Sequence, residues 1–151
     1  KDGADLQART QLLVASTMGA TAFQKGLGAM HALAHPLGAR FDAHHGLLNA
    51  ILMPYVLQAN RSATAGKLTG LARALDFANP SFDAFFERVL LLREEIGIPK
   101  RLGDIGIDAT EAILVGERAV VDPTAATNPI AFTAEQYSAL FQDAVEGNLA
   151  S

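Results

Sequence analysis

Apolar residues recur at helical spacing along most of this 151-residue chain, and this periodicity restricts its fold more than any other feature. Half of the residues are hydrophobic, and that share is rich in Ala and Leu, which favour helix over strand. One face of a predicted helix carries Phe82, Phe85, Phe86, Val89, Leu90 and Ile96. The sequence therefore predicts a single all-α domain over residues 1–151, with at least six helices and no strand.

Capping residues, glycines and prolines set the expected helix boundaries. We expect four helices over residues 5–25, 29–39, 45–60 and 63–75. Three further helices are predicted from their N-terminal caps: Asn79 before Pro80, Asp108 with Glu111, and Thr133 with Gln136. The helix over 5–25 is rich in small residues, so we expect it in the middle of the bundle. Pro36 predicts a kink or an early end, the Phe stripe is expected to be core, and residues 122–132 are expected to form a loop.

Composition excludes several classes of function. The formal net charge of −4 argues against nucleic acid as a partner, because a basic patch is the expected footprint. The absence of Cys excludes disulfides, thiolate metal ligands and a Cys nucleophile. The apolar stretch Leu12–Phe23 is too short to span a bilayer, and the acidic N-terminus lacks the pattern of a secretion signal. We therefore expect a cytoplasmic protein without a membrane partner, and the missing initiator Met fits a chain that begins inside a longer protein.

All four histidines fall between positions 31 and 45. His31 and His35 are four residues apart on a predicted helix, so they project from one face. The turn after Gly38 brings His45 back to the same region, and three imidazoles converge. Neutral imidazole is a ligand for zinc and ferrous iron, and the apolar neighbours of His31 and His35 favour the neutral form. The alternative is that these histidines are hydrogen-bonded core residues.

Residues 23–56 resemble the signature region of the iron-containing (group III) alcohol dehydrogenases. The matching residues are Gly26-Leu27-Gly28, His31, Ala34-His35, Gly38, His45-Gly46, Asn49-Ala50 and Met53-Pro54-Tyr55-Val56, with the histidines spaced by four and then ten. Thr127-Asn128-Pro129 also agrees with that family, and the succession of helices covers essentially the whole chain.

The resemblance implies the C-terminal helical domain of the dehydroquinate synthase-like fold, which in the family follows a nucleotide-binding α/β domain. That N-terminal domain is absent from this chain. One divalent metal, Fe²⁺ or Zn²⁺, is expected between the two domains, with His31 and His45 as two of its ligands. His35 is expected to act in catalysis as a proton relay rather than as a ligand. The implied activity is hydride transfer between an alcohol or aldehyde and NAD or NADP, which the absent domain mainly binds.

Two departures from the family pattern matter. Position 44 is His where the family usually has Pro, so His44 is either exposed to solvent or an auxiliary ligand or relay. The family's Asp-x-x-x-His ligand pair has no counterpart before His31. We therefore expect weak or absent metal binding, and no activity, in this chain alone.

Two other functions stay open: a related enzyme, such as a glycerol dehydrogenase or a maleylacetate reductase, and a non-catalytic helical metal-binding module. The sequence also leaves open the substrate and whether the protein is a homo-oligomer.

Overall fold

The computed structural model describes residues 2–149. These residues form seven α-helices: α1 (Leu6–Ala22), α2 (Gly28–Phe41), α3 (His45–Ala59), α4 (Arg61–Ala74), α5 (Phe82–Glu95), α6 (Ala112–Val120) and α7 (Ala134–Glu146). Short 3₁₀ turns cover Phe23–Lys25, Leu102–Ile105 and Ala125–Thr127. The described part of the chain contains no strand, so the predicted all-α class is confirmed.

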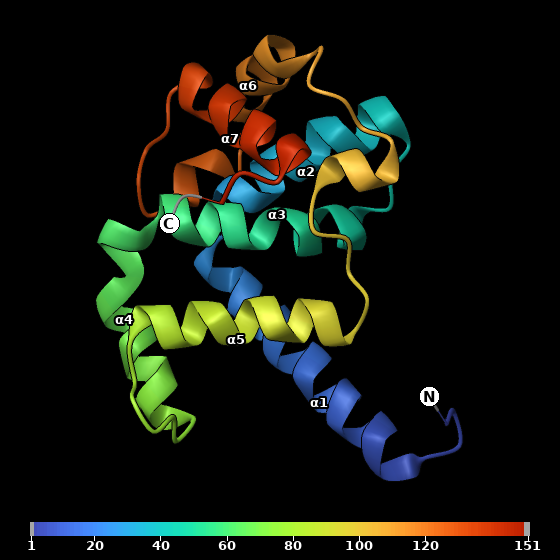
Figure 1. Cartoon of the computed structure of the whole chain (residues 1–151), viewed down its shortest axis with the longest axis vertical. Helices are drawn as coiled ribbons and strands as arrows, with labels where there is room; N and C mark the ends of the chain where they lie inside the picture. Colours follow the sequence, from blue (N-terminus) through green and yellow to red (C-terminus); the bar gives the residue numbers. More distant parts are fainter. Residues whose placement is uncertain (1, 150–151) are drawn as a thin grey trace.

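The core lies between α2, α3, α6 and α7, which form the upper part of the molecule in Figure 1. Helix α2 packs against both α3 and α6, and α7 packs against α6 and α3. Leu33, Leu48 and Phe141 from three of these helices are fully buried, and each such side chain stabilises the fold by about 1.5–3 kcal/mol. The helix that carries His31 and His35 is therefore held by packing on two sides.

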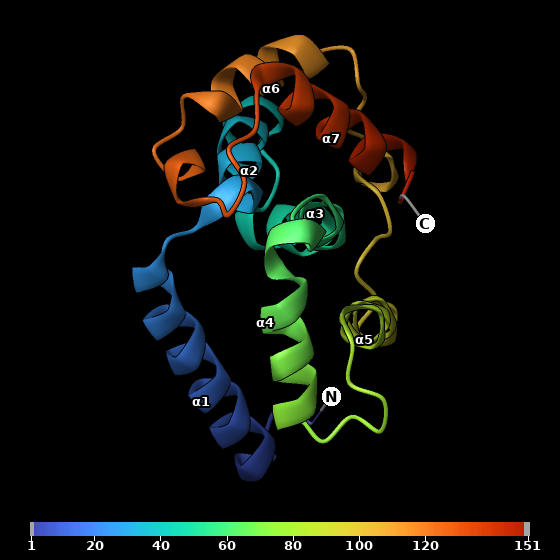
Figure 2. The same ribbon diagram turned by 90° about the vertical axis from the view of Figure 1, so that its left-hand side faces the viewer.

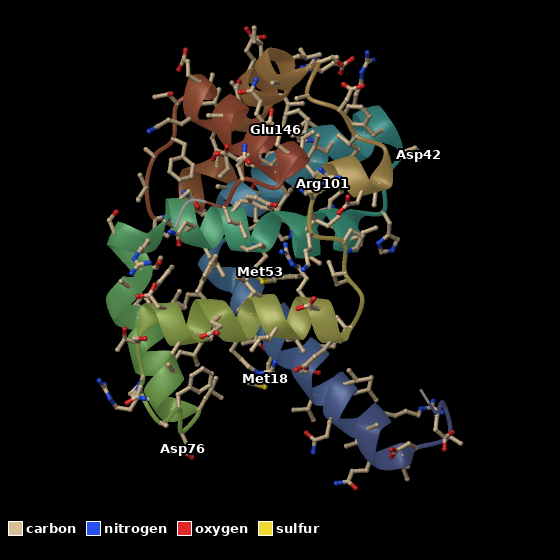
Figure 3. The ribbon with its side chains drawn as sticks, viewed as in Figure 1. Met18, Asp42, Met53, Asp76, Arg101 and Glu146 are labelled. Atoms are coloured by element: carbon tan, nitrogen blue, oxygen red, sulfur yellow. The ribbon has the colours of Figure 1, made fainter. Side chains whose placement is uncertain are left out.

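Helix α1 makes no contribution to this core, contrary to the expectation that it lies in the middle of the bundle. None of its residues is buried, and Leu12, Leu13 and Met18 are 68–71% exposed. Figure 2 shows α1 running away from α2, α3, α6 and α7, and Figure 3 shows Met18 on it. Its apolar residues are spread around the helix, and small side chains permit close packing without supplying a partner. No helix among residues 2–149 is long and apolar enough to cross a membrane.

Helix α5 lies below α3 and packs against α3 and α4 (Figure 1). Of the apolar stripe that was expected to be core, Phe82 alone is buried, whereas Ile96 is 64% exposed. The members between them are half-buried. The stripe is thus core at its first turn only, because α5 touches the main bundle along one side.

Two predicted helix starts are wrong for a common reason. Helix α5 is capped by Ser81, whose Oγ accepts a hydrogen bond from the amide of Ala84 at 3.0 Å, and not by Asn79. Asp108 accepts from the amide of Thr110 at 2.9 Å in a local turn, and α6 begins later, at Ala112. In both places the backbone amides form other local hydrogen bonds, which replace those of the predicted cap.

Two other local features are settled by the structure. Thr133 and Gln136 form the predicted capping box at the start of α7. Pro36 predicted a kink or an early end of this helix, and the early end does not occur, because α2 runs on to Phe41. Proline removes one helical hydrogen bond, and the burial of residues on both sides of it offsets that loss.

Candidate metal centre

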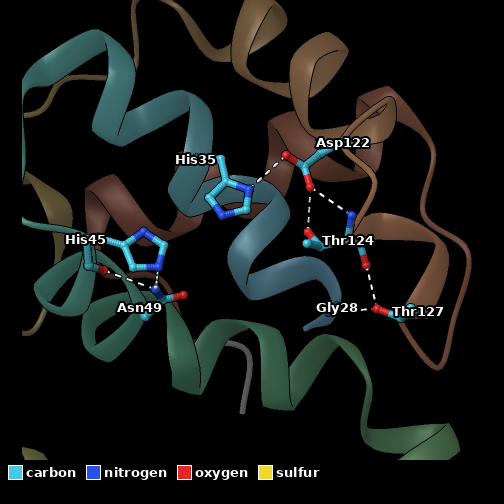
Figure 4. Close-up of polar contacts among 7 residues, drawn as sticks. All are labelled: Gly28, His35, His45, Asn49, Asp122, Thr124 and Thr127. Atoms are coloured by element: carbon cyan, nitrogen blue, oxygen red, sulfur yellow. Dashed lines mark hydrogen bonds and ion pairs between the residues drawn. The ribbon is translucent and has the colours of Figure 1, made fainter. Parts of the chain in front are cut away.

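Three histidine side chains meet where α2 and α3 adjoin, as the sequence predicted. The ring centroids of His31 and His45 are 5.1 Å apart, those of His35 and His45 are 5.5 Å apart, and those of His31 and His35 are 5.8 Å apart. His31 and His35 project from one face of α2, and His45 is the first residue of α3. Figure 4 shows His35 and His45 facing each other across the junction.

The reversal between the two helices depends on Asp42 and His44. Asp42 ends α2 in the left-handed region, with φ 49°, and Figure 3 marks it at the turn. His44 then serves as the N-cap of α3, and its Nδ1 accepts a hydrogen bond from the amide of Leu47 at 3.3 Å. His44 is exposed and makes no ring contact with the other three histidines. Sequence reasoning missed this capping role because His is an uncommon N-cap residue.

His31 is the buried member of the cluster, at 8% exposure. Burial lowers the pKa of His31, and the neighbouring His45 and His35 lower it further, against a smaller opposing effect of the Leu27 backbone. Its Nδ1 atom is buried and has no partner in hydrogen-bonding geometry among the described residues. A neutral imidazole is a suitable ligand for a divalent metal.

His45 is held by Asn49, one turn along α3. The Asn49 Nδ2 atom lies 3.0 Å from the His45 carbonyl oxygen and 3.0 Å from Nε2 of the same residue. Because the carbonyl can only accept, this atom is the amide nitrogen, and it donates to both groups. The Nε2 atom of His45 therefore carries a lone pair.

His35 is paired with Asp122, which sequence reasoning did not single out. The His35 Nδ1 atom lies 2.9 Å from Oδ2 of Asp122, in the loop that follows α6 (Figure 4). Asp122 in turn accepts hydrogen bonds from the amide of Thr124 at 2.8 Å and from its hydroxyl at 2.6 Å. The two partners are 87 residues apart, so no local pattern indicates the contact.

The same loop also caps α2, which explains the Thr127-Asn128-Pro129 pattern. The amide of Gly28 donates to the Thr127 hydroxyl, and the amide of Ala29 donates to the Asn128 side chain, both at 3.1 Å. Asn128 also exchanges amide hydrogen bonds with the buried Asn60, at 2.9 and 3.0 Å. The start of the histidine-bearing helix is thereby fixed to two distant segments.

A cleft of about 490 Å³ opens beside His35, between α2 and α6. Arg40 on α2 and Glu111 at the start of α6 form an ion pair at its edge, and the Arg40 Nε–Glu111 Oε2 distance is 2.6 Å. The remaining lining residues are Pro36, Ala39, Leu114, Val115, Arg118, Val121 and Asp122. The cleft gives solvent access to the His35–Asp122 pair.

The donor set fits a divalent metal in part. His31 and His45 offer two neutral imidazoles at one place, and imidazole suits both Fe²⁺ and Zn²⁺. Within residues 2–149 no group of three or more His, Asp or Glu side chains is placed to hold an ion. The two histidines can thus supply part of a ligand set that needs further donors.

The fold and the histidine cluster together define an all-helical domain with a candidate metal centre. Residues 1–145 match the C-terminal part of the Fe-containing alcohol dehydrogenase family. The chain belongs to this family, and the resemblance seen in residues 23–56 is confirmed.

The relatives cover almost all of this chain. Alcohol dehydrogenase 4 of Saccharomyces cerevisiae is 34% identical over 149 residues, which span 97% of this chain and 39% of that protein. The solved alcohol dehydrogenase from Oenococcus oeni is 33% identical, with a TM-score of 0.87 over 95% of this chain and 39% of that one. A solved 1,3-propanediol oxidoreductase is 33% identical, with a TM-score of 0.86 over 94% and 39%. The chain thus spans about two fifths of the length of these relatives.

Proposed function

We propose that this chain is the metal-binding, helical part of an NAD(P)-dependent alcohol dehydrogenase. The observation that carries the proposal is the convergence of the His31, His35 and His45 rings within 5.1–5.8 Å of one another. Membership of the family and the similarity to alcohol dehydrogenases support it. In this proposal a nucleotide-binding domain and the remaining metal ligands lie outside the 151 residues.

His31 and His45 have the role of metal ligands. Burial favours the neutral form of His31, and the Nε2 lone pair of His45 accepts a hydrogen bond from Asn49, which a bound metal would replace. When bound, a divalent ion supplies a Lewis acid that lowers the pKa of a substrate hydroxyl. The chain's own contribution is to hold the two ligands at the junction of α2 and α3.

His35 has the role of proton acceptor. Its Nδ1 is engaged by Asp122, which leaves Nε2 as the nitrogen that can take the hydroxyl proton. NAD(P)⁺ supplies the hydride acceptor, so the alcohol loses one hydride and one proton and becomes an aldehyde or ketone. In aldehyde reduction, His35 returns the proton to the same oxygen.

The substrates we propose are small alcohols and the matching aldehydes. A 1,3-propanediol oxidoreductase is among the most similar solved structures, so 1,3-propanediol is a sensible first substrate to assay.

Metal content and activity of the intact protein test the proposal together. His31→Ala and His45→Ala each remove one ligand, so both variants should lose bound metal, by elemental analysis, and NAD(P)-linked alcohol oxidation. His44→Asn is the matched control, since it removes a histidine from the same segment but keeps a side chain suited to the cap of α3. Full metal occupancy in both ligand variants would refute the ligand assignment.

A further inference from the structure

Asp122 is more enclosed than a surface ion-pair partner. Its side chain is 13% exposed, against 41% for that of His35. Three groups lie within hydrogen-bond distance of its carboxylate, at 2.6–2.9 Å: the Thr124 amide and hydroxyl at Oδ1, and His35 Nδ1 at Oδ2. Both oxygens are therefore used, and the orientation of the carboxylate is fixed.

The protonation states follow from these bonds. Burial alone would raise the pKa of Asp122, but the hydrogen bonds from Thr124 and His35 outweigh it and lower the pKa below its usual value. An ionised carboxylate accepts hydrogen bonds and donates none. The shared proton therefore lies on His35 Nδ1, and in the neutral form of the ring the lone pair lies on Nε2.

The ring is also held on its other side. His35 stacks on His45, with an interplanar angle of 15° and centroids 5.5 Å apart. In Figure 4 the His35 ring lies between His45 and Asp122. A ring stacked on one neighbour and hydrogen-bonded in its plane by another has little freedom to turn.

We propose that Asp122 is the positioning residue that fixes His35 in the Nδ1–H tautomer, so that Nε2 is the nitrogen presented to the substrate hydroxyl. This inference rests on the proposed function, because it assigns His35 the role of proton acceptor. Asp122 itself touches no reacting atom. The hydrogen bond that one imidazole nitrogen donates holds the proton on that nitrogen and leaves the lone pair of the neutral ring on the other.

A structural alternative must be separated from this role, since Asp122 also ties the loop after α6 to α2. Asp122→Asn makes the distinction. The Thr124 amide can only donate, so the Asn oxygen must stay on Thr124 and the Asn NH₂ must face His35. That group donates to Nδ1 and forces the proton of the neutral ring onto Nε2, while the loop keeps its contacts.

The tautomer can be read in the intact, metal-free protein labelled with ¹⁵N-histidine. Long-range ¹H–¹⁵N correlations at alkaline pH should show His35 protonated at Nδ1 in the wild type and at Nε2 in Asp122→Asn. Glu111→Gln is the matched control, because it removes a carboxylate from the same cleft that pairs with Arg40 instead. It should leave the His35 tautomer unchanged.

Kinetics of the metal-loaded protein supply the second readout. Asp122→Asn should lower kcat by roughly 10²–10⁴-fold, as loss of general acid–base assistance does, with KM and metal content near wild type. Glu111→Gln should keep the wild-type kcat. An unchanged His35 tautomer in Asp122→Asn, or the same change in Glu111→Gln, would overturn the inference. An inverted tautomer with wild-type kcat would support the positioning by Asp122 and refute the proton-acceptor role in the proposed function.

Discussion

A Cβ atom at position 26 would lie 2.3 Å from the Cβ atom of Thr127. Gly26 has φ +106°, a backbone conformation that other residues rarely adopt, and it lies in the segment that leads from α1 into α2. Thr127 belongs to the loop that caps α2. The Gly-Leu-Gly pattern is thus explained by a close approach of two segments, which brings the loop with Asp122 next to the histidine-bearing helix.

Gly26→Ala should therefore destabilise the protein. A residue in such a strained backbone conformation costs of the order of 1–3 kcal/mol, and the collision with Thr127 adds to it. Urea unfolding monitored by circular dichroism measures the change. Gly66→Ala in α4 is the control, because no atom lies within 4 Å of its added Cβ, and alanine there should stabilise the helix by roughly 0.5–1 kcal/mol. Equal stability of Gly26→Ala and wild type would mean that the loop moves away at no cost.

Asn128→Ala should be costly for a different reason. The Asn128 amide serves both the Ala29 N–H and the buried Asn60 side chain, and the substitution leaves both without that partner. An unsatisfied buried polar group costs about 1–3 kcal/mol, so the free energy of unfolding should fall by at least that amount. Asn148→Ala, which removes an exposed bond to Glu146, should change it by less than about 0.5 kcal/mol. Equal effects of the two variants would contradict this account of Asn128.

The features that the sequence predicted well are those with a local cause. Thr133 caps α7 because its partner Gln136 is three residues away, and His31 and His35 share a face because helical geometry requires it. The pairing of His45 with them needed only the short turn between α2 and α3. Asn79 is not a cap because Ser81, two residues later, caps the helix instead. Asp108 is not a cap because its side chain accepts a hydrogen bond from the Thr110 amide in a local turn. The sequence pattern alone does not distinguish these alternatives from the predicted caps.

The features that the sequence did not predict depend on distant segments. Asp122 reaches His35 across 87 residues, and its role becomes visible only when α6 is packed on α2. The predicted position of α1 is wrong because the expected contacts are missing. A helix rich in small and apolar residues can pack closely, but none of the described residues buries α1. Periodicity indicates which residues prefer burial, whereas the three-dimensional contacts decide which of them are buried.

Substitution of one leucine on α2 and one on α1 tests how much α1 contributes to the stability of this chain. Leu33 on α2 is fully buried, whereas Leu13 on α1 is 70% exposed. Leu33→Ala should cost about 2–5 kcal/mol, as deletion of a core side chain does, and Leu13→Ala less than about 0.5 kcal/mol. Urea unfolding of the 151-residue chain measures both. Similar losses in the two variants would show that α1 is packed against something beyond the contacts described.

His35→Ala separates proton transfer from metal binding in the intact protein. If His35 takes the hydroxyl proton and His31 and His45 hold the metal, its removal should lower kcat by roughly 10²–10⁴-fold. Metal content, measured by elemental analysis on the same sample, should stay at the wild-type level. A loss of metal as complete as that in His31→Ala would make His35 a ligand and contradict the division of roles.

His44 should matter for stability and not for turnover. Its Nδ1 accepts the hydrogen bond of the Leu47 amide at the start of α3, and loss of an N-cap side chain typically costs about 0.5–2 kcal/mol. His44→Ala should therefore lower the free energy of unfolding, whereas His44→Asp should restore it, because Asp is a strong N-cap and its charge favours a helix N-terminus. Thermal unfolding of both variants, alongside kcat and metal content in the intact protein, distinguishes the cap from a catalytic role.

Since His44 makes no ring contact with the other histidines, kcat should stay within about twofold of wild type in both variants. A large fall in kcat in His44→Asp, with the fold intact, would instead make His44 an auxiliary ligand or relay.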